Sequence, residues 1–157
     1  MRYWLMKSEP SEMSIDSLAA LPGQTVAWDG VRNYQARNFM RNQMQIDDLV
    51  FFYHSSCPQP GIAGIVRVSA LAYLDATQFD PTSKYFDAKS SRENPRWFNV
   101  EVKFLEKTRL LPLQELRACP ELAGMRILQK GNRLSITPID PDEWVFITKK
   151  LQALSDK

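Results

Sequence analysis

One stretch of the sequence brings an aromatic ring, a turn and many hydrogen-bonding side chains together: VAWDGVRNYQARNFMR, residues 26–41. Trp28 ends a short apolar run, and Asp29-Gly30 is a dipeptide that marks a turn. An indole ring can stack on the face of a nucleobase, an interaction worth roughly 1 to 3 kcal/mol per base. Trp28 is therefore the first candidate for a nucleobase contact, with burial in the core as the alternative.

Amide and guanidinium side chains follow the turn. Asn33 and Gln35 each offer a donor and an acceptor, which reading a Watson–Crick edge requires. An Asn beside a turn also commonly bonds its own backbone. Arg37 and Arg41 lie one helical turn apart and can hold one phosphate together, or form an exposed polar stripe. Arg32 belongs to the same patch, so we expect base-reading amides beside three phosphate-binding arginines.

Two other apolar runs end in polar side chains. Lys7 and Ser8 end the run RYWLMKSE and can line the floor of a pocket, with Ser8 donating to a base carbonyl. The Lys7 side chain can equally extend into solvent. His54 and Ser55 end the run LVFFYHSS and are expected at the same pocket mouth, although a lone His at a strand end is more often a structural hydrogen-bonding group.

The remaining aromatic residues divide into two groups. Tyr34, Tyr85 and Trp97 are candidate secondary stacking groups for bases, with packing as the alternative for each. Trp4 and Trp144 share faces with apolar residues and are expected in the core.

Histidine and cysteine are too few for several classes of site. His54 is the single histidine, and Cys57 and Cys119 lie far apart outside any CxxC pattern. These counts exclude a metal site built on several imidazoles and support neither a zinc motif nor a disulfide framework. No Rossmann or P-loop glycine fingerprint is present. We therefore expect no metal and no cofactor.

Composition and charge favour a globular protein inside the cell. The 157 residues are 44% hydrophobic and 24% charged, and the net charge of +2 neither predicts nor opposes nucleic-acid binding. Bases outnumber acids between Lys84 and Arg109, which is typical of a phosphate-tracking surface or of a solvated face. No apolar run is long enough to span a membrane or form a signal peptide. We expect a cytoplasmic protein, or a nuclear one if the source is eukaryotic.

The pattern of apolar residues predicts the elements that must position these side chains. Strands are expected at residues 2–9, up to Trp28, 49–56, 61–74, 96–111 and 134–138. Short helices are expected at residues 14–21, 34–44, 113–116 and 121–129, with a last one through Trp144, Ile147, Thr148 and Leu151. Residues 75–95 form a long surface loop, of a length that is often functional. The fold class is therefore α+β, a mixed sheet or small barrel of about six strands flanked by short helices.

Two strands carry more specific expectations. Gly61, Ala63 and Gly64 permit close approach of another backbone or a ligand. Residues 97–104 alternate, so one face of this strand should be apolar and the other wet. The apolar face holds Phe98, Val100, Val102 and Phe104, and the wet face holds Trp97, Asn99, Glu101 and Lys103.

The order of YWLMKSEP, WDGVRNYQARNFMR, VFFYHS, GIAGIV, FDPTSKYFDAKS, PRWFNVEV and GNRLSITP resembles the EVE domain family over nearly the whole chain. The resemblance implies a single EVE domain over residues 1–157 with a PUA-like mixed β-barrel. That superfamily binds RNA or modified nucleobases and includes the related YTH domains. Trp28 matches the tryptophan wall of the YTH aromatic cage, and Met6-Lys7-Ser8 resembles its first strand. A second cage wall is not assigned.

The expected function is that of a reader module. Its partner would be DNA or RNA with a modified base, which flips into a pocket walled by Trp28, and the chain is expected to be a monomer. The alternative is a small PUA-like hydrolase acting on a modified nucleobase or nucleoside, with a desolvated Lys7 as the reactive group. Lys7, Ser8 and Glu9 are adjacent, but neighbours on a strand point to opposite faces. A third possibility is a protein-interaction module.

Overall fold

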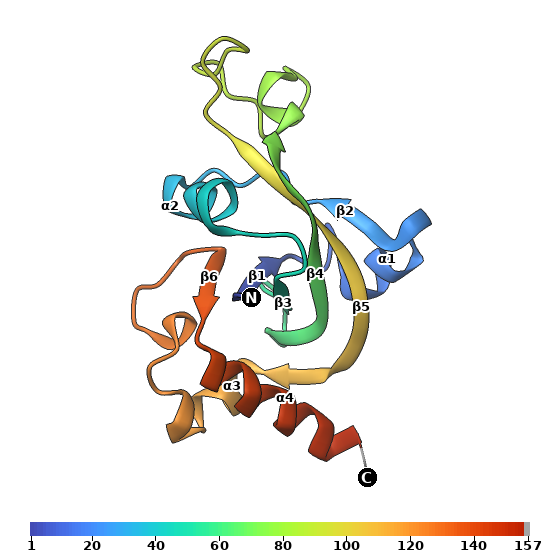
Figure 1. Ribbon diagram of the computed structural model, residues 1–157, viewed down its shortest axis with the longest axis vertical. Coiled ribbons are helices and arrows are strands. Elements are labelled where there is room, and N and C mark those ends of the chain that lie inside the picture. The colour runs from blue at the N-terminus through green and yellow to red at the C-terminus, as the bar shows by residue number, and fades with distance from the viewer. Residues whose placement is uncertain (156–157) are drawn as a thin grey trace.

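The computed structural model describes residues 1–155 and contains one six-stranded sheet (Figure 1). The strands lie in the order β2-β5-β4-β3-β1-β6. Their bounds are β1 Tyr3–Ser8, β2 Thr25–Ala27, β3 Leu49–His54, β4 Gly61–Leu74, β5 Phe98–Pro112 and β6 Ile136–Ile139. Strands β1 and β3 are parallel and all other pairs are antiparallel, so the sheet is mixed. The expected α+β fold with six strands and short helices is confirmed.

The sheet is strongly bent but is not closed by hydrogen bonds. Strands β4 and β5 are the longest, and register shifts interrupt their pairing at four places. Bulges of this kind increase twist and let strands curve. Both strands bend around the rest of the molecule in Figure 1, while β2 and β6 remain at the two edges.

Both faces of the central strands are buried, as their continuous apolar runs predicted. In β1, Trp4 and Met6 belong to one hydrophobic cluster, and Leu5 belongs to a second cluster on the other face. In β3, Phe52 belongs to the first cluster and Phe51 to the second. Trp144 packs in the second cluster, with its ring centroid 3.9 Å from that of Phe51. Trp4 and Trp144 are therefore core residues, as expected.

The small residues of β4 are needed for close packing of backbones. A Cβ atom at Gly61 would lie 2.4 Å from the carbonyl oxygen of Leu111 in β5. A Cβ atom at Gly64 would lie 2.6 Å from the Ile15 side chain and 2.8 Å from the Glu106 carbonyl oxygen. The close approach predicted here is to protein atoms.

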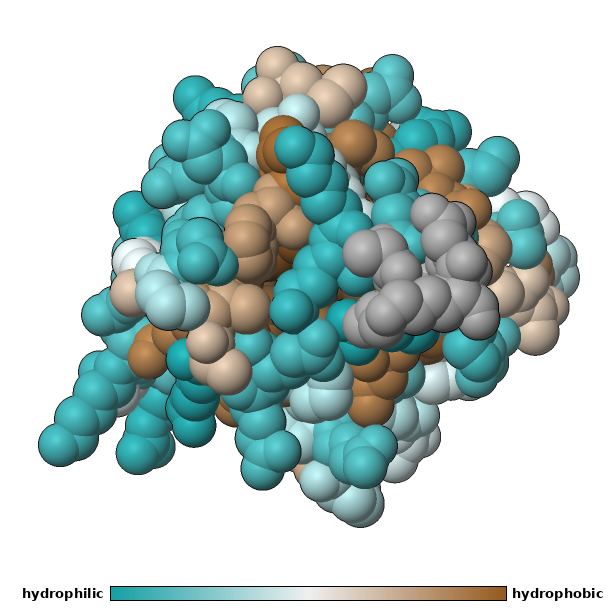
Figure 2. Space-filling view, turned by 90° about the horizontal axis from the view of Figure 1, so that it is seen from below, coloured by the Kyte–Doolittle hydropathy of each residue, from teal (hydrophilic) through white to brown (hydrophobic). Residues whose placement is uncertain are grey.

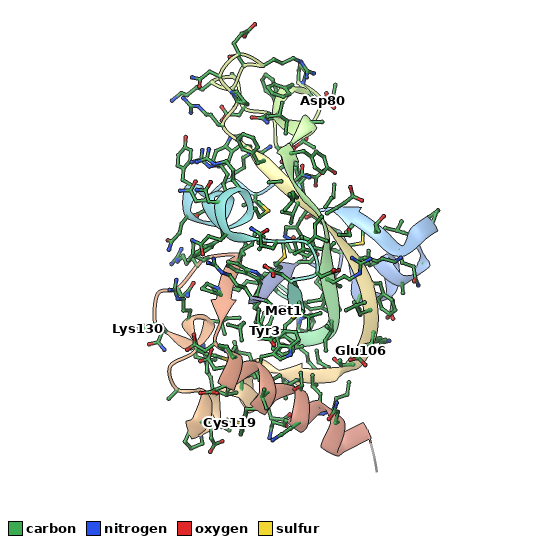
Figure 3. The ribbon with its side chains drawn as sticks, in the orientation of Figure 1. Met1, Tyr3, Asp80, Glu106, Cys119 and Lys130 are labelled. Carbon is green, nitrogen blue, oxygen red and sulfur yellow. The ribbon has the colours of Figure 1, made fainter. Side chains whose placement is uncertain are left out.

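The helices are short and cover the sheet at its ends. They are α1 Ile15–Ala20, α2 Tyr34–Asn38, α3 Leu113–Arg117 and α4 Pro141–Ser155, with 3-10 turns at Pro22–Gln24, Ala76–Phe79, Pro120–Leu122 and Arg126–Leu128. Ser14 caps α1 by accepting a hydrogen bond from the Ser17 N–H, as predicted. Figure 3 shows side chains filling the space between α4 and the sheet, with Cys119 at this end and Asp80 at the opposite end of the molecule.

Two helix predictions were wrong in extent. The expected helix 34–44 is α-helical only to Asn38, and Phe39–Gln43 forms a wider π turn. This change of period moves Gln43 to the surface, while Met40 and Met44 stay buried. The segment 121–129 is not one helix, because Met125 adopts an extended conformation between two 3-10 turns.

The expected wet face of β5 is wet only in part. Trp97 and Asn99 are buried, with 5% and 2% of their surfaces exposed, whereas Glu101 and Lys103 are half-buried. The loop between β4 and β5 folds back over the start of β5, and its Gln78 side chain hydrogen-bonds the Trp97 backbone N–H and carbonyl oxygen. The alternating pattern of residues along a strand carries no information about a loop that covers the strand.

The surface seen from the α4 side is mainly hydrophilic, with apolar residues showing between polar ones (Figure 2). None of the helices within residues 1–155 combines the length and apolar character needed to cross a membrane. Cys57 and Cys119 are free thiols.

Candidate functional site

A cavity of about 670 Å³ lies where β1, β2 and β3 end. Trp28 follows β2 directly, Ser55 follows β3, and Lys7 and Ser8 close β1. Five of the residues predicted for the site line this cavity: Lys7, Ser8, Trp28, Arg32 and Ser55. The lining also includes Glu9, Glu12, Asp29, Gly30, Tyr85, Arg133 and Ser135.

Trp28 is held firmly at the cavity wall. Its backbone N–H donates to the Val100 carbonyl oxygen of β5 at 2.8 Å, which continues the pairing of β2 by one residue. The Phe52 ring meets the indole edge to face, with centroids 5.6 Å apart. Only 8% of Trp28 is exposed. The ring is therefore part of the core and of the cavity lining at once.

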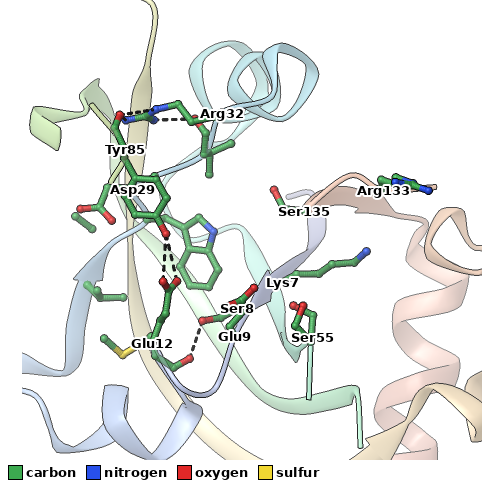
Figure 4. Close-up of a pocket in the computed structure, with 17 residues that line it drawn as sticks. Lys7, Ser8, Glu9, Glu12, Asp29, Arg32, Ser55, Tyr85, Arg133 and Ser135 are labelled. Carbon is green, nitrogen blue, oxygen red and sulfur yellow. Dashed lines mark hydrogen bonds between the residues drawn. The ribbon is translucent and has the colours of Figure 1, made fainter. Parts of the chain in front are cut away.

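Tyr85 supplies a second aromatic ring to the cavity. It packs on Gly30, where a Cβ atom would lie 2.7 Å from two ring carbons of Tyr85, and Gly30 has φ of 78°. A side chain at residue 30 is therefore excluded both by the backbone conformation and by the ring. The Tyr85 hydroxyl donates to Glu12 at 3.2 Å (Figure 4). Glu12 also forms an ion pair with Lys84.

Arg32 fixes the loop that carries Tyr85. A guanidinium group has five N–H donors, and here each one has an acceptor within the protein. The acceptors are the carbonyl oxygens of Val31 and Tyr85, the latter twice, with Asp75 Oδ2 and Thr77 Oγ1. Arg32 thus has no N–H left for a phosphate, and the expectation of a phosphate-binding Arg32 is corrected: it positions Tyr85.

Asp75 is the buried partner of Arg32. The hydrogen bonds by which Arg32 and Asp75 hold Gly30, Thr77 and Tyr85 are here called the clamp. Its carboxylate accepts from the Gly30 N–H at 2.8 Å, from Arg32 at 3.0 Å, and from both the N–H and the hydroxyl of Thr77. Burial by itself would raise the pKa of Asp75, but the hydrogen bonds from Thr77, Gly30 and Arg32 outweigh it and hold the pKa below its ordinary value. The carboxylate therefore stays charged and ties the turn at Gly30 to the loop.

The opposite side of the cavity is cationic. Figure 4 shows Lys7 extending toward Arg133, with Ser135 and Ser55 on either side of it. The backbone places these groups, since the Lys7 N–H donates to the Ser135 carbonyl oxygen and the Ser55 N–H to that of Ser8. Burial lowers the pKa of Lys7. Its ammonium group is thus partly desolvated and faces the cavity.

The acidic side chains of the cavity lie nearer the aromatic side. Glu9, Glu12 and Asp29 line it, and burial, followed by the negative charge of Asp75, raises the pKa of Asp29. The Ser8 hydroxyl donates to the Met13 carbonyl oxygen at 2.6 Å. This bond takes the donor that was expected to reach a base carbonyl, so Ser8 faces the cavity as an acceptor.

Four other predicted base contacts lie outside the cavity lining. His54 Nε2 accepts from the Ile15 N–H at 3.1 Å and anchors the start of α1, and burial lowers the pKa of His54. Asn33 Oδ1 accepts from the Ala36 N–H at 3.0 Å and caps α2. Gln35 is exposed, and Tyr34 stacks on Trp97 rather than on Trp28.

Arg37 and Arg41 converge on one side-chain oxygen away from the cavity. Both donate to Asn38 Oδ1, and Arg37 also donates to the Arg96 carbonyl oxygen. Burial and then the Arg41 charge lower the pKa of Arg37. Within residues 1–155 neither guanidinium forms an ion pair. Their role in phosphate binding stays a prediction.

The EVE domain family model matches residues 2–150 of the chain. The chain belongs to the EVE domain family. It is 42% identical to mouse thymocyte nuclear protein 1 over 163 aligned residues, which cover 92% of this chain and 71% of the mouse protein. The family assignment agrees with the resemblance seen in the sequence.

Solved structures of EVE domain proteins have the same fold. A Leishmania major protein is 44% identical with a TM-score of 0.93, over 99% of this chain and 97% of that one. Human THYN1, solved in complex with DNA that contains 5-methylcytosine, is 40% identical with a TM-score of 0.91, over 97% of this chain and 98% of that one. An ASCH protein from Zymomonas mobilis, 9% identical with a TM-score of 0.55, shares the fold alone.

Sequence reasoning on this EVE domain missed part of the cavity. Tyr85 was a candidate for stacking but had no assigned place, and Glu12 was not a candidate. The signals were indirect: Tyr85 lies in the long loop marked as functional, and Arg133 and Ser135 lie in the block GNRLSITP. No spacing rule connects Trp28 with Tyr85, because the clamp joins Arg32 to residues 43 to 53 positions away.

Proposed function

We propose that this EVE domain binds nucleic acid and accommodates one flipped, modified base in the cavity between Trp28 and Tyr85. The observation that supports it most is the human relative, which was solved with 5-methylcytosine-containing DNA and shares the fold over 97% of this chain. The position of Trp28 in the lining of this cavity adds to it. Unstacking a base costs a few kcal/mol, so the cavity must recover that cost.

The cavity chemistry is suited to an aromatic ligand with a polar edge. Its volume of about 670 Å³ lies within the range of roughly 300 to 1,000 Å³ that is usual for small-ligand pockets. Trp28 and Tyr85 offer ring faces, and the Lys7 ammonium and Arg133 guanidinium offer donors to carbonyl or phosphate oxygens. The Ser8 and Glu12 oxygens offer acceptors to an exocyclic amino group. One site per chain is expected for a monomer.

The test compares short fluorescein-labelled DNA strands that differ only in one 5-methylcytosine, with RNA strands of the same sequence as a second arm. Wild-type protein should prefer the methylated strand in fluorescence anisotropy, and Trp28→Ala should lose the preference, with binding weakened by about tenfold or more. Because Trp28 is buried, Tyr85→Ala is the second variant. Phe86→Ala is the matched control, since Phe86 lies in the same loop but does not line the cavity. Absence of any preference among cytosine and its modified forms in the wild type would overturn the proposal.

A hydrolase is the second candidate, and one observation favours it. Lys7 is desolvated in a cavity, which is how lysine nucleophiles are activated. Ser8, however, donates its hydroxyl hydrogen to Met13 and is not available as its partner. We therefore propose binding rather than catalysis. Incubation with modified nucleosides and mass analysis tests this choice: turnover that Lys7→Ala abolishes would support the hydrolase.

A further inference from the structure

A second group of rings leads from the cavity wall to the surface. The Arg32 guanidinium lies 5.7 Å from the Tyr85 ring centroid and 5.2 Å from that of Trp97. Trp97 in turn stacks on Tyr34, with centroids 4.8 Å apart and planes at 19°. Tyr85, Arg32, Trp97 and Tyr34 therefore form a continuous series, here called the stacking ladder. One end of the ladder lines the cavity and the other is at the surface.

The outer ring of the ladder, Tyr34, is half exposed. Trp97 covers one face of this ring. The Arg37 guanidinium is 4.7 Å from the Tyr34 centroid and 6.0 Å from that of Trp97. The second distance is far shorter than it would be if Arg37 lay beyond Tyr34 in line with Trp97. Arg37 therefore lies beside the stacked pair rather than in line with it, and half of the Tyr34 surface stays exposed.

Arg37 lies against this ring, Arg41 donates to the same Asn38 side-chain oxygen as Arg37, and both guanidinium groups have donors to offer. Arg37 uses three of its N–H groups within the protein and Arg41 uses two, so each retains N–H groups that can meet phosphate oxygens. Tyr73 provides the contrast on β4: it is 43% exposed, but its hydroxyl donates to the Glu101 carboxylate. An exposed tyrosine alone is thus not distinctive here, whereas a half-exposed tyrosine ring beside guanidinium groups with unused donors is.

We infer that Tyr34 is a platform on which the base next to the flipped base stacks, while Arg37 and Arg41 contact the backbone phosphate beside it. This inference rests on the proposed function, because it assigns a place to the nucleotide that flanks the one in the cavity. The flipped base leaves one face of its neighbour unstacked, and that face is free to stack on the Tyr34 ring.

The experiment varies two positions of a single-stranded DNA independently. The central base is cytosine or 5-methylcytosine, and the nucleotide on its 5′ or 3′ side is either normal or abasic. Wild-type protein should lose about tenfold in affinity when the flanking base on one side is removed, because a stacked base contributes that much. Tyr34→Ala should bind normal and abasic strands alike and keep the preference for 5-methylcytosine. Tyr34→Phe keeps the ring and should therefore lose affinity for the abasic strand as the wild type does. Tyr73→Ala should also behave as wild type.

The two proposals fail differently in this design. A flanking effect that persists in Tyr34→Ala, or that is absent from the wild type on both sides, would overturn the platform. An equal affinity of wild-type protein for cytosine and 5-methylcytosine strands would overturn only the reading of that modification in the cavity.

Discussion

Residues 28–32 and residues 33–41 are adjacent in sequence and belong to different surfaces. Trp28 to Arg32 line the cavity, whereas Asn33 to Arg41 cap, form and flank the short helix α2 outside its lining. The turn at Gly30 separates them, and Asp75 and Arg32 hold that turn in place. A dense run of polar and aromatic residues that predicts one site from its sequence is thus divided between two surfaces.

The largest effect is expected from Asp75→Ala, which removes the carboxylate of the clamp that supports residues 28–32. The buried carboxylate accepts from Gly30, Arg32 and Thr77, and loss of one partner of a buried pair costs about 3 to 5 kcal/mol. The free energy of unfolding from urea denaturation measures this. Asp47→Asn is the control, because Asn tolerates the φ of 75° at this position and the exposed pair with Arg67 should contribute less than about 1 kcal/mol. Similar losses in the two variants would contradict the clamp.

A second prediction separates backbone strain from the contact with Tyr85. Gly30 and Gly131 have φ of 78° and 79°, but a Cβ atom at Gly131 would meet nothing within 4 Å. Gly131→Ala should cost about 1 to 2 kcal/mol from strain alone. Gly30→Ala should lower the free energy of unfolding by more than that and should also displace Tyr85. The preference of this variant for a modified base should therefore fall. If both variants lose equal stability and keep that preference, the Tyr85 wall is not positioned by Gly30.

Asn33→Ala tests residues 33–41, in which Asn33 caps α2. Loss of a helix cap costs about 1 kcal/mol, and the modified-base preference should not change, because Asn33 Oδ1 binds the Ala36 N–H. Asn33→Asp keeps an acceptor at the cap and should retain stability. Thermal unfolding and the anisotropy assay together distinguish a cap from a base reader, since a reader would lose discrimination in both variants.

The smallest effect is the pH dependence of stability contributed by His54. His54 precedes the cavity residue Ser55 in sequence, but its side chain anchors α1. Burial holds the folded pKa of His54 below its unfolded value of about 6.5, so the unfolded chain binds the proton more readily. Its contribution is therefore complete above about pH 6.5 and is lost as the pH falls toward the folded pKa. The loss should be about 1 kcal/mol or less, one hydrogen bond to the Ile15 N–H. The stability difference between wild type and His54→Gln, measured from pH 5 to 8, should shrink at the acidic end; a constant difference would refute the role.

The sequence predicted the sheet well because burial on two faces leaves a strong local pattern. The runs around Trp4 and Phe52 are apolar at successive positions, and both clusters exist as expected. The predicted strand ends then located Lys7, Trp28 and Ser55, since residues at the end of a buried strand lie where the sheet stops and a cavity can open. These predictions needed only local information.

The remaining features depend on contacts between distant residues. Tyr85 reaches the cavity because Arg32 binds its carbonyl oxygen from 53 residues away, and Trp97 is buried because the same loop covers it. Whether the Asn33 amide binds a base or its own helix is decided by a competition that spacing does not reveal. Long-range hydrogen bonds, rather than periodicity, complete this site.

The clamp holds Tyr85 through its main chain, and this has a consequence for changing the protein. Arg32 donates twice to the Tyr85 carbonyl oxygen, which every amino acid possesses. The side chain at position 85 can therefore be exchanged without loss of these two bonds. Substitution there offers a way to widen or narrow the cavity, and so to select ligands of a different size on an unchanged framework.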